Sequence, residues 1–172
     1  MKQLRKTELK RFLKQDRGDK NSHDIVVIAE NIQYAQNVAS LFRLLDAVKA
    51  KELVLSGISH KPPFGKDLKK VSRNKEESLP WKYVEHVGND LNRFKKDGYE
   101  IIALEITDKS VHYAKRDYPQ KVCIVVGNEA YGVTKTTLEK VDSAVYLPMY
   151  GKGASLNVTM SLTALVYHII NS

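Results

Sequence analysis

The sequence predicts an α/β fold in which a mostly parallel sheet is covered by helices on both faces. Three observations lead to this prediction. Short apolar runs rich in β-branched residues recur along the chain, and each is typical of a buried strand. Segments with helical spacing of apolar residues separate these runs, as in parallel sheets covered on both faces. The 172 residues, of which 42% are hydrophobic and 28% charged, suit one globular domain with a sizeable core.

The expected elements follow one another without an internal repeat or a low-complexity linker. We expect strands at residues 24–30, 52–58, 81–87, 100–106, 122–127 and 144–150. The helices expected between and after them are one carrying Val38, Leu41, Leu45 and Val48 on one face, a basic one ending before Pro80, one at 89–98 closed by Gly98, one at 134–141 and one from Ser155 onward. Residues 112–119 are expected to form a connection between two strands.

Basic residues are concentrated in two blocks. The net charge is +8, and residues 1–20 carry eight Lys or Arg against three acidic residues. Residues 61–75 carry six Lys or Arg against one Asp, so each block has a net charge of +5. Solvated helix faces would explain either block alone, whereas two blocks on an otherwise slightly acidic chain favour a nucleic-acid partner. The residues expected to bind RNA are Lys6, Lys10, Arg11, Lys14, Lys66, Lys69, Lys70 and Arg73.

The sequence predicts neither a metal site nor a membrane segment. Cys123 is the single cysteine and lies in an apolar run, which indicates a core residue and a reducing, cytoplasmic setting. None of the five histidines stands at metal-ligand spacing from it, so we expect no metal. No apolar run approaches the roughly 18 residues of a membrane span, and the N-terminal segment lacks the apolar block of a secretory signal.

The last strand, loop and helix, LPMYGKGASLNVTMSLTALVYHII, have the form of a nucleotide-binding turn, yet they end the sequence. GKGAS lacks the P-loop pattern, and Leu156 stands where a dinucleotide fingerprint needs its third glycine. What remains is a turn with Gly151 and Gly153 before a helix expected to start at Ser155, whose free N–H groups can hold a polar ligand. The structural alternative is that Ser155 only caps the helix and that Asn157 has no role in its first turn.

Two further motifs carry polar residues near the expected ligand edge of the sheet. Glu129 lies in the loop VVGNEAYGV after a buried strand, where a carboxylate can position a cation or accept a hydroxyl proton. A simple surface turn is the alternative. The motif NVASLFR runs from Asn37 to Arg43 and places the arginine beside the apolar face of the first helix. There the guanidinium either pairs within the structure or faces a ligand.

Taken together and in this order, NVASLFR, GNEAYGV and LPMYGKGASLNVT resemble the SpoU (TrmH-like) family of RNA ribose 2′-O-methyltransferases, in the SPOUT superfamily. The resemblance covers about residues 24–170. The sequence departs from the family pattern at Ala35, where a proline is usual, at Ala39, often a glycine, and at Lys49, where the family has glycine. These departures concern packing around the first helix more than the chemistry.

The resemblance implies a basic N-terminal extension over residues 1–22 and a SPOUT methyltransferase domain over residues 23–172. It also implies a deep trefoil knot at the C-terminus that forms the pocket for S-adenosylmethionine, although protein chains in general avoid knots. Carried over by position, the residues expected around the adenine and ribose of this cofactor are Leu104, Gly127, Leu147, Met149 and Leu156. The expected catalytic residues are Asn37, Arg43, Glu129, Ser155 and Asn157.

The resemblance also implies roles for these residues. Arg43 corresponds to the family's proposed base, but an arginine pKa above about 12 suits a phosphate clamp better. Glu129 would orient Arg43 or polarise Asn37, while Ser155 and Asn157 would contact the substrate or the methionine part of the cofactor. A homodimer is implied, in which Arg43 reaches the partner's cofactor.

The implied reaction is S-adenosylmethionine-dependent methylation of a ribose 2′-hydroxyl in structured RNA. We expect tRNA, because relatives that act on rRNA often carry an extra N-terminal domain and only about 22 residues precede the first strand here. Within tRNA, the basic extension favours the D-loop over the wobble position. The alternatives are an rRNA 2′-O-methyltransferase, a non-catalytic RNA-binding protein of the same fold, and a flavodoxin-like nucleotide-binding regulator without RNA affinity.

Overall fold

The computed structural model describes residues 1–16 and 23–172. Arg17 and Lys20 of the N-terminal basic block lie outside the described residues. The core of the molecule is a seven-stranded sheet with the order β3-β2-β1-β6-β4-β7-β5, and all of its strand pairs are parallel. Its strands are β1 (Asp24–Glu30), β2 (Glu52–Ser56), β3 (Trp81–Val84), β4 (Glu100–Leu104), β5 (Val111–His112), β6 (Lys121–Val126) and β7 (Ser143–Tyr146).

Strand β1 lies inside the sheet and shows why the strands read as continuous apolar runs. It pairs with β2 on one side and β6 on the other, with Val27 opposite both Leu53 and Ile124. Ile25, Val27 and Ala29 face one hydrophobic core, and Val26 and Ile28 face a second core on the opposite side of the sheet. Because both faces are buried, alternation between apolar and polar residues is absent, as the sequence predicts.

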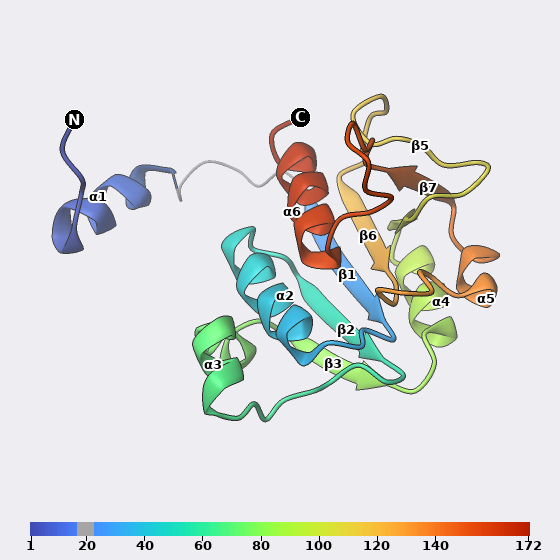
Figure 1. Cartoon of the computed structure of the whole chain (residues 1–172), viewed down its shortest axis with the longest axis horizontal. Helices are drawn as coiled ribbons and strands as arrows, with labels where there is room; N and C mark the ends of the chain where they lie inside the picture. Colours follow the sequence, from blue (N-terminus) through green and yellow to red (C-terminus); the bar gives the residue numbers. More distant parts are fainter. Residues whose placement is uncertain (17–22) are drawn as a thin grey trace.

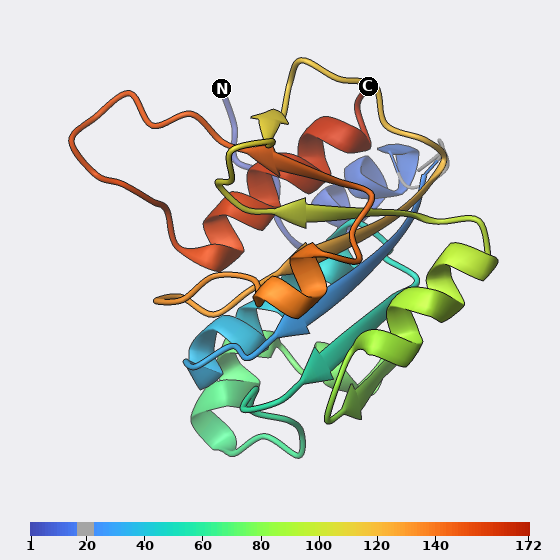
Figure 2. The same ribbon diagram turned by 90° about the vertical axis from the view of Figure 1, so that its right-hand side faces the viewer.

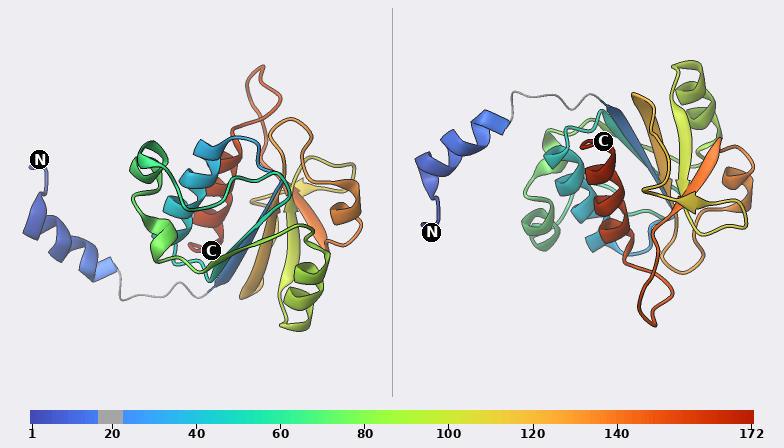
Figure 3. Two further views of the ribbon diagram at one scale, coloured as in Figure 1. Left: turned by 90° about the horizontal axis from the view of Figure 1, so that it is seen from below. Right: turned by 90° about the horizontal axis from the view of Figure 1, so that it is seen from above.

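Helices cover both faces of the sheet, as predicted. Figure 3 shows α2, α3 and α6 on one side of the sheet and α4 and α5 on the other. The larger core contains residues of α2 and α6, and the smaller core contains residues of α4. The helices are α1 (Lys6–Asp16), α2 (Ala35–Ala47), α3 (Lys66–Ser72), α4 (Gly88–Lys96), α5 (Lys135–Leu138) and α6 (Val158–Ile169), with a 3₁₀ turn η1 (Lys75–Glu77) after α3.

Several elements differ from the expected boundaries. The basic helix before Pro80 is broken, because Arg73 and Asn74 both adopt left-handed backbone conformations that end α3 before η1. A two-residue strand, β5, forms at the start of the expected connection at 112–119 and pairs only with β7 among the described strands. Gly98 follows α4 with φ +83°, as its expected place at the helix end requires.

Helix α1 stands apart from the body of the molecule in Figures 1 and 3. It is amphipathic, with Leu9, Phe12 and Leu13 at helical spacing, yet these three side chains are 40–52% exposed. The helix therefore adds nothing to either hydrophobic core of this chain. Within the described part of the chain, no helix is long and apolar enough to cross a membrane.

Candidate active site

A cavity of about 570 Å³ opens where β4, β6 and β7 end. The loops that follow parallel strands at their carboxyl ends are the usual place for a ligand in such a sheet. Four stretches of chain line the cavity: the start of α2, residues 104–106, residues 126–132, and residues 146–161 with gaps. The three sequence motifs, which are up to 120 residues apart, therefore meet at one site.

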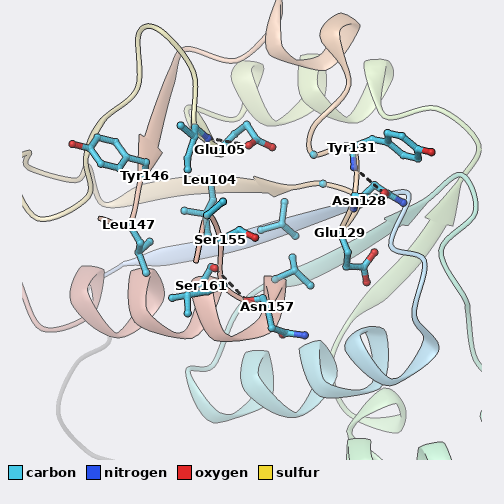
Figure 4. A pocket seen from close by; sticks show the side chains of 18 of the residues that line it. Leu104, Glu105, Asn128, Glu129, Tyr131, Tyr146, Leu147, Ser155, Asn157 and Ser161 are labelled. Atoms are coloured by element: carbon cyan, nitrogen blue, oxygen red, sulfur yellow. Dashed lines mark hydrogen bonds between the residues drawn. The ribbon is translucent and has the colours of Figure 1, made fainter. Parts of the chain in front are cut away.

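One end of the cavity is apolar. Figure 4 shows Leu104 at the end of β4 and Leu147 after β7 at this end, together with the ring of Tyr146. Met149 and the half-exposed Leu156 also line the cavity. All five residues expected around the cofactor, Gly127 included, thus lie on the wall of a single cavity.

The other end of the cavity holds a chain of hydrogen bonds between side chains. The Nδ2 of Asn157 donates to Oδ1 of Asn37 at 3.0 Å, and Nδ2 of Asn37 donates to Oε1 of Glu129 at 2.6 Å. Glu129 also accepts hydrogen bonds from the backbone N–H groups of Gln33 at 2.8 Å and Tyr34 at 3.3 Å. This chain connects α2, the loop after β6 and α6.

The direction of these hydrogen bonds is determined by Asn157 and Glu129, the two outer residues of the series. Oδ1 of Asn157 accepts from the backbone N–H groups of Thr159 and Met160, so its NH₂ group must face Asn37. Glu129 only accepts when ionised, so the NH₂ group of Asn37 must face the carboxylate. Each amide uses one N–H in this chain, and no second acceptor for either amide occurs among the described residues. One N–H of each amide is therefore free for a ligand.

Glu129 is held as a carboxylate. Partial burial raises its pKa, but hydrogen bonds from Asn37 and from the backbone of Gln33, Glu129 and Tyr34 outweigh this and lower the pKa below the ordinary value. A carboxylate with a lowered pKa is a weak proton acceptor, so Glu129 is suited to positioning rather than to general-base catalysis. Of its two expected partners, Asn37 is in contact and Arg43 is not.

The loop that carries Glu129 is shaped by two glycines. A Cβ atom at Gly127 would overlap the backbone of Gly132 and Val133, and Gly132 itself has φ +68°. The Glu105 carboxylate fills the space beside Gly132 and accepts from the N–H of Val133 at 2.9 Å. Gly127 is therefore required by the packing of the loop, as well as lining the cavity. Sequence reasoning missed Glu105, because its contact lies 28 residues away.

The last helix begins later than expected, and its cap is Asn157. Helix α6 starts at Val158, while Ser155 belongs to a long loop that extends away from the sheet (Figure 2). The expectation that Ser155 starts the helix is therefore wrong. Asn157 caps the helix instead, because its Oδ1 accepts from Thr159 while its Nδ2 donates to Asn37. Ser155 still lines the cavity (Figure 4). The glycines of this loop have open surroundings: nothing crowds Gly151, and at Gly153 only the Met149 side chain is within ordinary contact distance.

Arg43 does not reach the cavity of its own chain. It lies six residues after Asn37 on α2, is exposed, and is absent from the cavity wall. Within the described residues it forms no ion pair or hydrogen bond. A structural ion pair, one of the two roles left open for this guanidinium, is thus excluded for the described part of the chain.

The cations expected to bind RNA are at the surface. Lys6, Lys10, Arg11 and Lys14 are exposed on α1, and Lys66, Lys69, Lys70 and Arg73 are exposed on or next to α3. Two of them form exposed ion pairs, Lys70 with Asp67 at 2.9 Å and Lys69 with Glu77 at 3.6 Å. Such pairs contribute little and can open when a phosphate competes. No cluster of His, Cys, Asp and Glu in the described ranges could hold a metal ion.

Comparison with known proteins identifies the family. The model of the SpoU rRNA Methylase family matches residues 24–167. The chain belongs to this family. Among curated relatives, the tRNA (guanosine(18)-2′-O)-methyltransferase of Aquifex aeolicus is 30% identical over 155 residues, covering 87% of this chain and 70% of the relative. The enzyme of the same name from Escherichia coli K12 is 27% identical over 147 residues, covering 84% of this chain and 62% of the relative. The chain thus spans less than two thirds of the latter protein.

Solved structures of SpoU proteins have the same fold. The structure described as A. aeolicus TrmH/SpoU tRNA modifying enzyme aligns with a TM-score of 0.78 and 27% identity, covering 95% of this chain and 83% of that one. The SpoU methyltransferase AviRb from Streptomyces viridochromogenes, in complex with the cofactor AdoMet, aligns with a TM-score of 0.75. At 23% identity over 91% of this chain and 60% of that one, this second likeness shows the fold alone.

Proposed function

We propose that this protein transfers a methyl group from S-adenosylmethionine to a ribose 2′-hydroxyl of tRNA, in the D-loop. The observation that carries the proposal is the two-ended cavity, with apolar side chains at one end and the chain from Asn157 through Asn37 to Glu129 at the other. The names of the A. aeolicus and E. coli relatives, which specify guanosine 18 of tRNA, support tRNA and the D-loop.

The cavity fits the proposed cofactor by size and chemistry. Its volume lies within the range of about 300–1,000 Å³ that is usual for small-molecule sites. Leu104, Leu147 and Met149 provide apolar walls that suit an adenine ring, and the loop at Gly127 leaves backbone groups at the wall. S-adenosylmethionine, when bound, supplies an activated methyl group. The protein therefore needs to align the ribose and to assist the loss of its hydroxyl proton.

The polar chain has the groups that this alignment requires. The remaining N–H donors of Asn37 and Asn157 can bind ribose oxygens, and the ionised Glu129 keeps the amide of Asn37 in one orientation. Ser155, in the exposed loop before α6, lines the same cavity and offers a hydroxyl group to the substrate. The 2′-hydroxyl proton can pass to solvent at this open site. None of these side chains therefore has to retain it.

We further propose a homodimer in which Arg43 of one chain completes the site of the other. The support is that Arg43 is exposed, unpaired among the described residues and absent from the wall of its own cavity. A guanidinium brought in by the partner would bind the phosphate next to the target ribose in a bidentate manner. Its positive charge would also lower the pKa of the 2′-hydroxyl. The guanidinium itself stays protonated, because the pKa of arginine is above about 12.

The remaining parts of the proposal concern the two ends of the chain. Residues 1–22 would form a basic extension that binds tRNA, together with the cations of α3, and residues 23–172 would form the SPOUT domain. A deep trefoil knot is proposed for the C-terminal segment. It is supported by the path of the chain, which leaves β7 near one edge of the sheet and returns to pack α6 on α2 in the large core. The protein would act in the cytoplasm without a metal ion.

Mapping of 2′-O-methylated nucleotides in cells tests this function. RNA from a strain that lacks the gene and RNA from the parent strain are compared by methylation-protected alkaline cleavage, in both the tRNA and the rRNA fractions. We expect a single tRNA D-loop position to lose its protection. Loss at an rRNA position instead would contradict the proposed substrate, and unchanged profiles in both fractions would contradict the enzymatic activity.

A further inference from the structure

Tyr131 is a large aromatic residue that the fold leaves without a partner. Its side chain is 89% exposed, although it lies on the wall of the cavity. Within the described part of the chain, its ring contacts no other ring or cation, and its hydroxyl group has no hydrogen bond. Burial of an aromatic side chain is favourable, so a ring left in water at the edge of a ligand site is available to a ligand.

The backbone beneath this ring is held firmly. Asn128 and Gly132 exchange two backbone hydrogen bonds of 2.8 and 3.0 Å across the turn. Oδ1 of Asn128 accepts from the N–H groups of Ala130 and Tyr131, while its Nδ2 donates to the carbonyl of Asn31 at 2.8 Å. Five hydrogen bonds therefore hold this turn in one conformation. A ring on such a turn loses little conformational entropy when a ligand packs against it.

The ring belongs to the polar end of the cavity. Figure 4 shows Tyr131 beside Asn128 on the side of Glu129, with its ring directed outward, away from Leu104 and Leu147. Tyr34 is a second exposed tyrosine on the wall of the same cavity. Its side chain is 57% exposed, and its backbone N–H donates to Glu129. Two exposed tyrosines therefore line the cavity in which the ribose is proposed to bind.

We propose that Tyr131, assisted by Tyr34, stacks on the base of the nucleotide whose ribose is methylated. This inference rests on the proposed function and extends it to the recognition of the substrate. A base can lie against a ring only after it has left its own stack, so the site would select an unpaired or extruded nucleotide. Every base has a π-face, so stacking would tolerate different bases at this position.

The chemistry of the site favours a base over a protein surface as the partner of these rings. Two tyrosines bury roughly 150–250 Å² each, so together they provide well below the about 800 Å² per partner of a stable protein interface. The free amide N–H donors of Asn37 and Asn157 at the same end suit a sugar.

Three substitutions at one position test the proposal. Tyr131→Phe keeps a stacking face, Tyr131→Leu keeps apolar bulk without one, and Tyr131→Ala removes both. Tyr167→Ala is the control, because Tyr167 is a 45% exposed tyrosine on α6 outside the cavity. The probe is an unmodified tRNA transcript, and each protein is assayed for single-turnover methylation, for KM of the RNA, for S-adenosylmethionine affinity by calorimetry and for oligomeric state.

We expect Tyr131→Ala and Tyr131→Leu to raise the KM for RNA by about 5- to 150-fold, the range for loss of one base–aromatic stack. Tyr131→Phe and Tyr167→Ala should stay within about twofold of wild type, and no variant should change cofactor affinity. On a transcript whose mapped target nucleotide is made abasic, the difference between Tyr131→Ala and wild type should disappear.

The other outcomes overturn the inference in distinguishable ways. If the wild-type protein methylates RNA but Tyr131→Ala does so equally well, stacking is refuted and the proposed function stands. If Tyr131→Phe raises the KM for RNA as much as Tyr131→Ala does, the hydroxyl group rather than the ring face makes the contact, and stacking is refuted. A change of oligomeric state in Tyr131→Ala would make the ring a protein contact. Inactive wild-type protein refutes the proposed function, and this inference with it.

Discussion

Substitution of Asn157 separates the two tasks that this side chain performs. Its Oδ1 caps α6 through Thr159 and Met160, and its Nδ2 donates to Asn37. Asn157→Ala removes both interactions. Asn157→Ser keeps a good helix cap but is too short to hold the amide of Asn37. The pair of variants therefore measures the cap and the link to Asn37 independently.

The expected loss of stability follows from these contacts. An N-cap contributes about 1 kcal/mol, within a range of about 0.5–2 kcal/mol. A neutral hydrogen bond contributes about 1 kcal/mol, and water can reach Asn37 once the exposed Asn157 is shortened, so no larger penalty is expected. We therefore expect Asn157→Ala to lower the free energy of unfolding by about 2 kcal/mol and Asn157→Ser by about 1 kcal/mol.

Urea unfolding followed by circular dichroism measures this difference, with melting temperatures as a check. For a chain of this size, 1 kcal/mol corresponds to roughly 2–4 °C in Tm. Both variants should also lose methyl transfer, since both release the amide of Asn37. Equal destabilisation of the two variants would refute the cap, and full activity in Asn157→Ser would refute the role given to the chain of hydrogen bonds.

Three further predictions concern Arg43, Glu129 and the N-terminal segment. Arg43→Ala and Arg43→Lys should both lose methyl transfer while calorimetry shows unchanged cofactor affinity, and verified heterodimers of Arg43→Ala with Asn157→Ala chains should regain activity; no regain would contradict a shared site. Because the folded pKa of Glu129 lies below its ordinary 4.5, its contribution to stability should be complete above about pH 4.5 and disappear as pH falls through the folded pKa. The free energy of unfolding should be measured for wild type and Glu129→Gln between about pH 3 and about pH 6. The variant should lack the pH dependence that Glu129 causes, and identical pH profiles of the two proteins would contradict this prediction. Deletion of residues 1–20 should spare cofactor binding but make the log–log salt slope of RNA affinity shallower by roughly 0.7–0.9 per lost phosphate contact; an unchanged slope would assign RNA binding to α3.

The sheet could be predicted from the sequence because its strands are buried on both faces. Runs such as Ile25–Ala29 have only one environment that suits them, so local composition is sufficient. Strand β5 could not be predicted, because two residues at the edge of the sheet carry no pattern of their own and depend on pairing with β7. Likewise, the left-handed residues Arg73 and Asn74 interrupt a sequence whose charge pattern gives no sign of a break.

The sequence pointed to three motifs at the ligand edge of the sheet, but not to the hydrogen bonds that join their side chains. The three motifs brought Asn37, Glu129 and Asn157 together as candidates, and the structure joins them by hydrogen bonds. Which residue caps α6 could not be decided locally, since Ser155 and Asn157 are both good capping residues. That choice depends on Asn37, 120 residues away. Arg43 has no hydrogen bond or ion pair among the described residues, so its binding partner could be predicted neither from the sequence nor from a single chain.

Methylation of a defined RNA tests the central claim most directly. Purified protein is incubated with an unmodified tRNA transcript and S-adenosylmethionine carrying a deuterated methyl group, and the digested nucleosides are analysed by mass spectrometry. The account predicts one labelled 2′-O-methylnucleoside from the D-loop in wild-type reactions, and none with Arg43→Ala. A label on a base, or no label on any RNA from protein that binds the cofactor, would contradict it.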